Sequence, residues 1–230
     1  MPLEIHPMTL DDTLSWVRIR NKAYYGPTHD VIHNGPVSEE TIRRVAEDWK
    51  AEIHEPNTWH YKVVDTDLAT SSDDPLDNRG QTIAFAVWAM RNVKAEVASD
   101  LAVDAVAKPK NMTTYSPPEL RFDVLKSLLR PLRAAMLEIM GTTKEFFMLN
   151  SIATLPDHQG RGAGRLLLDW GMKKADDEGL LTYLTATSAG KRMYEKRGFV
   201  DVKTIKWDRT PWGGEGADCH WCMWKKGLNR

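Results

Sequence analysis

The sequence predicts a mixed α/β protein of the α+β kind, in which helices flank a central sheet. Stretches rich in β-branched and aromatic residues alternate with segments of helical periodicity along most of the chain. In the C-terminal half, a strand, a glycine-rich loop, a helix and a second strand follow one another. These two observations set the fold class before any motif is considered.

The length and the charge of the chain limit the classes of function that it can have. The 230 residues, 42% of them hydrophobic, can bury a sizeable core and favour a single domain spanning 1–230. Because 31 Lys plus Arg balance 32 Asp plus Glu, no overall field recruits nucleic acid or an anionic membrane. No leader-like N-terminal segment and no apolar run of roughly 18 residues is present in the sequence. We expect a soluble cytoplasmic protein, a nuclear location being left open, that is a monomer or homodimer without nucleic-acid or membrane partners.

The two cysteines, Cys219 and Cys222, do not predict a metal site. A zinc site would need a second pair of ligands, and no similar cluster occurs elsewhere in the sequence. In a strand, side chains three residues apart point to opposite faces. We therefore expect two small packing residues and no bound metal.

The N-terminal half reads as two helices and three strands. Asp11 or Asp12 offers an N-cap for the first helix, and Ser38 offers one for the second, which Pro56 closes. The expected order is a strand at 3–8, a helix to Ala23, a loop over 24–36, a helix from 38, and strands at 59–65 and 81–90 joined by a long, flexible hairpin loop.

The C-terminal half supplies the remaining elements. Residues 91–120 have mixed character, and a short helix near 95–103 is the one element that the sequence suggests there. Pro131 should kink a helix over 118–141 or split it in two. There follow a strand at 145–155, a helix at 165–179 with Gly179 as terminator, a strand at 180–187, a short helix at 189–198 and strands at 199–207 and 218–226.

The loop "QGRGAGR", residues 159–165, predicts an anion cradle. A glycine-rich turn that feeds a helix gathers free backbone N–H groups at the positive end of the helix dipole. Gly160, Gly162 and Gly164 let the backbone approach a phosphate closely, and Arg161 and Arg165 could add charge-assisted contacts. A plain glycine-rich turn with solvated arginines is the alternative reading.

Spacing excludes the two common nucleotide loops. A P-loop needs four residues between its glycines and then Lys-Ser or Lys-Thr, which "GRGAGRLL" lacks. A dinucleotide fingerprint that begins at Gly160 or Gly162 would need glycine where Arg165 or Leu167 stands.

Two motifs resemble those of the GNAT acyltransferases, which use acetyl-CoA. They are "IATLPDHQGRGAG" and "ATSAGKRMYEKRGF", in the family's order, and the resemblance is sharp over 146–200. It implies the GNAT fold: a central mixed, mostly antiparallel sheet of about six or seven strands, splayed at the slot for CoA. It also implies a cofactor-binding core at about 146–200 and a family-specific insertion at 91–120.

The resemblance implies which residues bind acetyl-CoA, the co-substrate. The diphosphate would lie on Gln159, Gly160, Arg161, Gly162, Ala163, Gly164 and Arg165, mainly on their backbone N–H groups. The backbone of Ile152, Ala153 and Thr154 would pair with the pantetheine arm, and Thr187 or Ser188 would contact CoA.

The resemblance places Tyr194 at the position of the acid that protonates the departing thiolate. The alternative is that its ring only packs the short helix or hydrogen-bonds the sulfur. Many relatives carry an acidic residue where this chain has Thr185. No general base is assigned, although Glu145, Asn150, Ser151 and His158 lie nearby in sequence.

The implied activity is acetyl-CoA-dependent N-acetylation of a primary amine of a small molecule or peptide. The alternatives are a noncatalytic CoA-binding regulatory module and an acyltransferase that uses a larger acyl-CoA or a hydroxyl acceptor. The acceptor groove would be framed by 24–35 and 206–224. Its tryptophans, Trp207, Trp212, Trp221 and Trp224, would either line a pocket or pack in the core, and His29, Asp30 and His33 could contact the acceptor.

Overall fold

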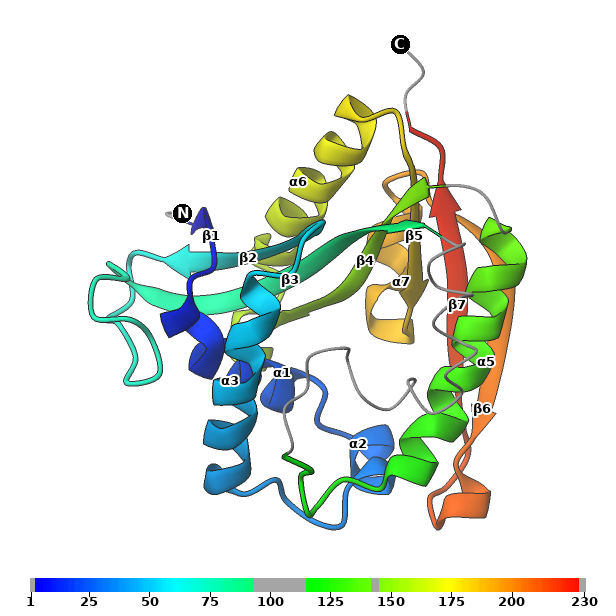
Figure 1. The fold of residues 1–230 in the computed structure, drawn as a ribbon, viewed down its shortest axis with the longest axis horizontal. Coiled ribbons are helices and arrows are strands. Elements are labelled where there is room, and N and C mark those ends of the chain that lie inside the picture. Colours follow the sequence, from blue (N-terminus) through cyan, green and yellow to red (C-terminus); the bar gives the residue numbers. More distant parts are fainter. Residues whose placement is uncertain (1–2, 93–114, 142–144, 228–230) are drawn as a thin grey trace.

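A seven-stranded sheet with the order β1-β2-β3-β4-β5-β7-β6 forms the centre of the molecule (Figure 1). The computed structural model describes residues 3–92, 115–141 and 145–227. Its strands are β1 Leu3–Pro7, β2 Thr58–Asp65, β3 Gln81–Asn92, β4 Glu145–Thr154, β5 Leu181–Ala186, β6 Val200–Asp208 and β7 Ala217–Lys225. Only β4 and β5 are parallel, as a pair joined by a crossover helix requires. The predicted mixed, mostly antiparallel sheet is confirmed.

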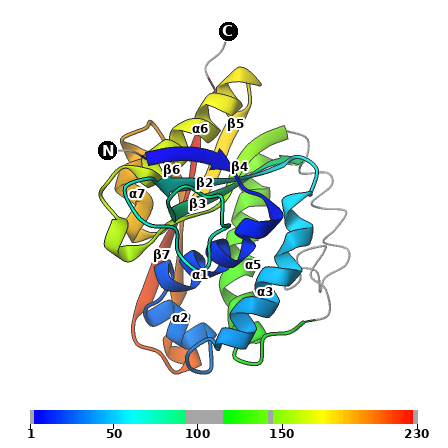
Figure 2. The same cartoon turned by 90° about the vertical axis from the view of Figure 1, so that its left-hand side faces the viewer.

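Helices cover both faces of the sheet, as Figure 2 shows. They are α1 Thr13–Ala23, α2 Pro27–Ile32, α3 Glu39–Ile53, α5 Phe122–Met140, α6 Ala163–Asp177 and α7 Ser188–Glu195, with 3-10 turns at Leu10–Asp12, Pro156–His158 and Thr210–Trp212. One face carries α6 and α7; the other carries α1, α3 and α5, with α2 against α5. Since β3 lies between both layers, it is buried from Thr82 to Ala89.

A glycine sets how closely α6 approaches the sheet. A Cβ on Gly171 would lie 2.1 Å from the ring of Trp88, so only glycine fits where the helix crosses β3. The Trp88 ring stacks on Phe147 of β4 at 5.1 Å between centroids. The helix that leaves the glycine-rich loop is therefore fixed firmly on β3 and β4.

One expectation for helices was wrong, and one of the two outcomes expected at Pro131 is excluded. Residues 24–36 are not all loop, because Pro27–Ile32 form α2, which starts with proline at a position where its missing N–H costs nothing. Pro131 does not split its helix, since α5 runs unbroken from Phe122 to Met140. The helix suggested near 95–103 lies outside the described residues.

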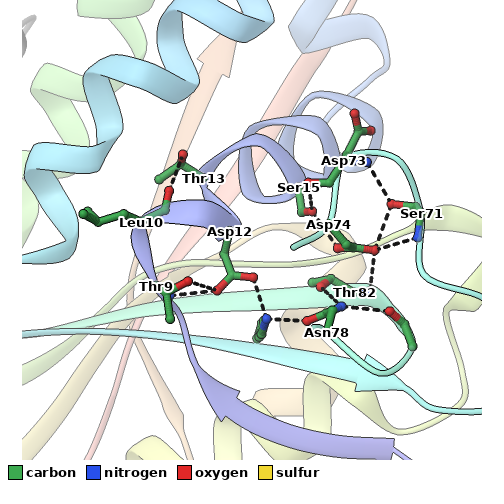
Figure 3. A network of polar contacts seen from close by, with 12 residues as sticks. Thr9, Leu10, Asp12, Thr13, Ser15, Ser71, Asp73, Asp74, Asn78 and Thr82 are labelled. Carbon is green, nitrogen blue, oxygen red and sulfur yellow. Dashed lines mark hydrogen bonds and ion pairs between the residues drawn. The ribbon is translucent and has the colours of Figure 1, made fainter. Parts of the chain in front are cut away.

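The β2–β3 loop, expected to be flexible, is anchored to α1 by hydrogen bonds (Figure 3). The hydroxyl of Ser15 donates to the Asp74 carboxylate at 2.6 Å, and Asp74 also accepts from the backbone N–H of Thr82. Arg18 forms an ion pair with Asp73 at 3.0 Å. The acidic residues Asp73 and Asp74 therefore attach the loop to α1 instead of leaving it free in solvent.

Asp12, one of the expected N-caps, has a different role. Its side chain makes no cap hydrogen bond to α1. It accepts from the N–H of Thr9 at 2.7 Å and pairs at 2.5 Å with Lys62, which also donates to Asn78. The predicted cap at Ser38 is confirmed, because its hydroxyl accepts from the N–H of Thr41 at 3.2 Å.

Both cysteines lie on β7 and are free thiols. Cys222 is fully buried against α5, and Cys219 is partly exposed. Among the described residues, no group of three or more His, Cys, Asp or Glu could hold a metal ion. The described helices include none that is long and apolar enough to cross a membrane.

Candidate active site

The candidate site begins where β4 and β5 part. Their pairing runs only from Phe146 and Leu181 to Leu149 and Leu184, although β4 continues to Thr154 and β5 to Ala186. A bulge in the pairing with β3 inserts Asn150 at this point, so an otherwise central strand exposes a side chain. The two central strands therefore splay into a slot.

Two residues of β4 present their backbone groups to the slot. Leu155 N–H donates to the Ile83 carbonyl of β3, so the alternation of an antiparallel pair turns Ala153 toward β3 as well. Ile152 and Thr154 face the other way. The Ile152 carbonyl accepts from the Tyr24 hydroxyl at 3.3 Å and the Thr154 carbonyl from the Gln159 amide at 3.5 Å. Of the three residues expected to pair with pantetheine, Ile152 and Thr154 have backbone groups directed at the slot, whereas the backbone of Ala153 is turned toward β3.

The glycine-rich loop offers free N–H groups beside open space. Gly160 and Gly162 have φ values of 76° and 96°, in the left-handed region that favours glycine, and a Cβ on either would meet nothing within 4 Å. The helical hydrogen bond from Leu166 N–H to the Gly162 carbonyl leaves the N–H groups at 163–165 without a helical acceptor. The loop and the first turn of α6 thus have the shape and polarity of an anion cradle.

The two arginines of the loop differ in their contacts. The Arg161 guanidinium pairs with the fully buried Asp65 at 2.5 Å and lies 2.9 Å from Nδ1 of His158. It ties the loop to the end of β2, and Asp65 compensates its charge there. Arg165 is 72% exposed and lies 3.3 Å from Asp169, so its charge can still reach an anion at the helix terminus.

Tyr194 of α7 is buried at 5% exposure. Its ring packs on Phe199 and lies so close to Gly190 that a Cβ there would be 2.8 Å from the ring. Burial, with a smaller contribution from the neighbouring Tyr24, raises the pKa of Tyr194 well above its ordinary value. The phenol of Tyr194 therefore stays protonated and can donate its proton.

The structure adds Tyr24, which the sequence analysis missed. It follows the last residue of α1, and its hydroxyl contacts the slot at Ile152. Burial of the hydroxyl raises the pKa of Tyr24, even though 42% of the residue is exposed. Nothing in the local pattern of residues 24–36 distinguishes it from Tyr25, which is 67% exposed.

Thr187 and Ser188 lie where β5 ends and α7 begins. Thr187 is the N-cap of α7, but its side chain makes no cap hydrogen bond, and both residues are exposed. Their hydroxyls are thus available to a ligand beside the slot.

The nearby candidates for a base fit poorly. Glu145 is exposed at the opposite end of β4 from Thr154. His158 has its Nδ1 beside Arg161, a position in which that nitrogen accepts. Asn150 and Ser151 lie at the bulge but are weak bases.

The expected acceptor groove contains a cavity of about 460 Å³. It lies between α2 and the β6–β7 loop, and Asp30, Trp212 and Glu215 are among its lining residues. Trp207 is buried instead and donates from Nε1 to Ser127 at 3.0 Å. Trp221 packs with the core beside α6 and α7. Of these tryptophans, only Trp212 lines the cavity.

His29 and His33 pack within the α1–α2 corner. Their rings stack at 4.1 Å, and Nε2 of His29 lies 3.2 Å from the Asn21 side chain. Burial lowers the pKa of both rings. Neither histidine lines the cavity.

Residues 132–201 match the family model described as an acetyltransferase (GNAT) domain. No curated protein matches the sequence significantly. The matched segment contains the end of α5, β4, the glycine-rich loop, α6, β5 and α7. The motifs read from the sequence therefore lie inside it.

Solved structures share the fold over nearly the whole chain. A polyamine N-acetyltransferase from Drosophila melanogaster is 12% identical with a TM-score of 0.63, over 97% of this chain and 99% of that one. Arylalkylamine N-acetyltransferase 2 from Aedes aegypti is 10% identical with a TM-score of 0.65, over 98% and 99%. Arabidopsis thaliana NAA60, solved in complex with acetyl-CoA, is 12% identical with a TM-score of 0.51, over 97% and 98%. Identities this low show the fold alone.

Proposed function

We propose that the chain, of which residues 132–201 match the model of a GNAT acetyltransferase domain, is an acetyl-CoA-dependent N-acetyltransferase acting on a primary amine of a small molecule or peptide. One observation carries the proposal: a loop of free N–H groups at the start of α6 lies at the end of a strand whose free edge faces a slot. A long ligand with an anionic middle and an amide-bearing arm fits that combination.

The described residues fit coenzyme A. The diphosphate would bind to backbone N–H groups of 160–165, where a Cβ at Gly160 or Gly162 would occupy open space. The pantetheine amides would pair with Ile152 and Thr154, in place of the Tyr24 and Gln159 side chains. Thr187 and Ser188 would supply hydroxyls at the far side of the slot.

Acetyl-CoA would supply an acetyl group activated as a thioester. A backbone N–H of the free β4 edge would polarise the thioester carbonyl as negative charge grows on its oxygen. Tyr194 would donate its proton to the departing sulfur. Because burial disfavours its phenolate, transfer would occur only as negative charge develops on that sulfur.

A primary amine is the acceptor that the cavity supports best. Asp30 and Glu215 bring carboxylates to its wall, and Trp212 brings an aromatic surface. The wall also holds two guanidinium groups: Arg209 is occupied by Asp218 and the Glu215 carbonyl, and Arg121 donates to the carbonyls of Val31 and Trp212. Carboxylates beside a tryptophan favour a cationic amine. The structural neighbours named above include enzymes for polyamines and arylalkylamines.

A thiol-release assay tests the proposal. Purified protein would be given acetyl-CoA with agmatine, spermidine or tryptamine, and free thiol would be measured against time. Amine-dependent release with an acetamide product seen by mass spectrometry is the expected result. Calorimetric binding of CoA without release for any amine would favour the noncatalytic module. An ester product, or faster turnover of longer acyl-CoAs, would identify the other alternative.

A further inference from the structure

His220 of β7 lies one residue beyond the part of β7 that pairs with β5. The last pair between β5 and β7 joins Ala186 to Trp221, and the next residue, Thr187, already caps α7. His220 therefore pairs only with Ile205 of β6 and lies one residue beyond the last β5–β7 pair, next to the end of β5 where the slot opens. It shares a sheet face with Cys222, which packs on α5, so it lies on the side of α1, α2 and the candidate acceptor groove.

The His220 ring is buried but not hydrogen-bonded at Nε2. The residue is 8% exposed, and this nitrogen has no hydrogen-bond partner among the described residues. Burial lowers the pKa of His220 below its ordinary 6.5, so the ring is neutral near pH 7. A buried polar atom without a partner is rare in folded proteins, and a catalytic role is one of its recognised explanations.

The charges around the ring suit a proton acceptor. Asp218, two residues away on the same face, is the group that favours the imidazolium. Thr28 of α2 and Arg209 of the β6–β7 loop hold the Asp218 carboxylate in place. The β6 partners of His220 and Asp218 are Ile205 and Trp207, which are uncharged. On β5, Thr185 and Tyr183 share its face, and α5 contributes the Ser127 hydroxyl bound to Trp207.

We propose that Nε2 of His220 accepts the proton of the acceptor ammonium at the mouth of the slot, an inference that rests on the proposed N-acetyltransferase activity. The ammonium N–H bond breaks and an Nε2–H bond forms, leaving a neutral amine. The amine nitrogen bonds to the thioester carbon while the carbon–sulfur bond breaks. The sulfur takes the Tyr194 proton, and solvent takes the proton from His220 and from the acetylated nitrogen and returns one to Tyr194. The Asp218 carboxylate stabilises the transient imidazolium.

The pH profile of kcat/KM tests this role, with the amine that the wild type turns over fastest. In the wild type, kcat/KM should rise with an apparent pKa below 6.5, because the ring must be neutral. H220Q should lose about 10²-fold or more of kcat/KM near pH 7. The deficit should shrink as the pH approaches the pKa of the amine, which then needs no base. Added imidazole should partly restore turnover to H220A.

His60 provides the matched control. It is also buried, and neither of its ring nitrogens has a hydrogen-bond partner in the part of the chain that the structure describes, but its ring packs on Trp16. H60Q should keep its kcat/KM, and imidazole should not affect H60A. Unchanged kcat/KM in H220Q, or a loss in H220A that imidazole does not restore, would overturn the inference. A wild type without amine-dependent thiol release would overturn the proposed function, and the inference with it.

Discussion

At the scale of single residues, burial determines what each titratable side chain near the slot can do. Tyr194 and Tyr24 come from opposite faces of the sheet, and burial raises the pKa of both phenols, so both remain donors. His220 is shifted in the opposite direction and remains neutral. A slot with a phenol that can donate to the sulfur and a neutral imidazole that can accept from the amine suits acyl transfer.

Replacing Tyr194 with phenylalanine should slow turnover by roughly 10²- to 10⁴-fold, as expected for a lost proton donor. The ring would still pack on Phe199, so the affinity for CoA measured by calorimetry should barely change. Tyr25→Phe, at a residue that is 67% exposed, is the control and should be neutral. Unchanged kcat in the Tyr194 variant would remove this residue from the chemistry.

At the scale of elements, the loop and α6 work as one unit that the rest of the fold holds in place. Arg161 attaches the loop to Asp65 at the end of β2, and Gly171 seats the helix on Trp88. These contacts keep the N–H groups at 160–165 in place before any ligand arrives. Such preorganisation lowers the entropy cost of binding an anion.

Replacing Gly162 with valine tests this unit. The new side chain would occupy the open space at the cradle, so CoA affinity should be lost while the far-ultraviolet circular dichroism spectrum persists. Gly179, at the other end of α6, also has a positive φ of 66° and no atom near a Cβ. Gly179→Val carries the same backbone strain without touching the cradle. Equal loss of CoA binding in both variants would contradict the loop assignment.

The sequence predicted the elements whose signals are local. Alternation identified the strands, Ser38 identified a helix start, and the spacing of glycines identified the loop. The misses depend on contacts between distant parts of the chain. The six residues of α2 resemble a turn in composition, and nothing near Arg161 reveals that its partner is Asp65. Tyr24 lies at the slot, and His220 lies beside the end of β5, only because α1 and β7 come together with β4 and β5 in the fold.

At the scale of the whole molecule, the helical layers on the two faces of the sheet contribute different parts of the candidate site. The α6–α7 side provides the candidate coenzyme site, and the side of α1, α2 and α5 provides the candidate acceptor groove. The layer of α1 and α3 also buries His60 against Trp16. Its burial makes the stability of the whole fold depend on pH.

Burial lowers the pKa of His60 to about 4, from an ordinary 6.5. Because this ring binds a proton more readily in the unfolded chain than in the folded chain, its contribution to the free energy of unfolding is fully present only above pH 6.5. It should fall by about 3 kcal/mol as the pH drops through 6.5 toward 4. Urea unfolding of the wild type and of H60Q at pH 7 and pH 4 measures this difference. Glu52, whose pKa burial raises to about 7, acts in both proteins and cancels. Parallel pH curves would contradict the prediction.

The central claim is that backbone N–H groups where the chain enters α6 bind the diphosphate of coenzyme A. A crystal structure of the protein with CoA tests it most directly. The account predicts diphosphate oxygens within about 3 Å of backbone nitrogens of 160–165, the hydrogen-bond range, and pantetheine along Ile152 and Thr154. A coenzyme bound elsewhere, with this loop free of it, would contradict the account.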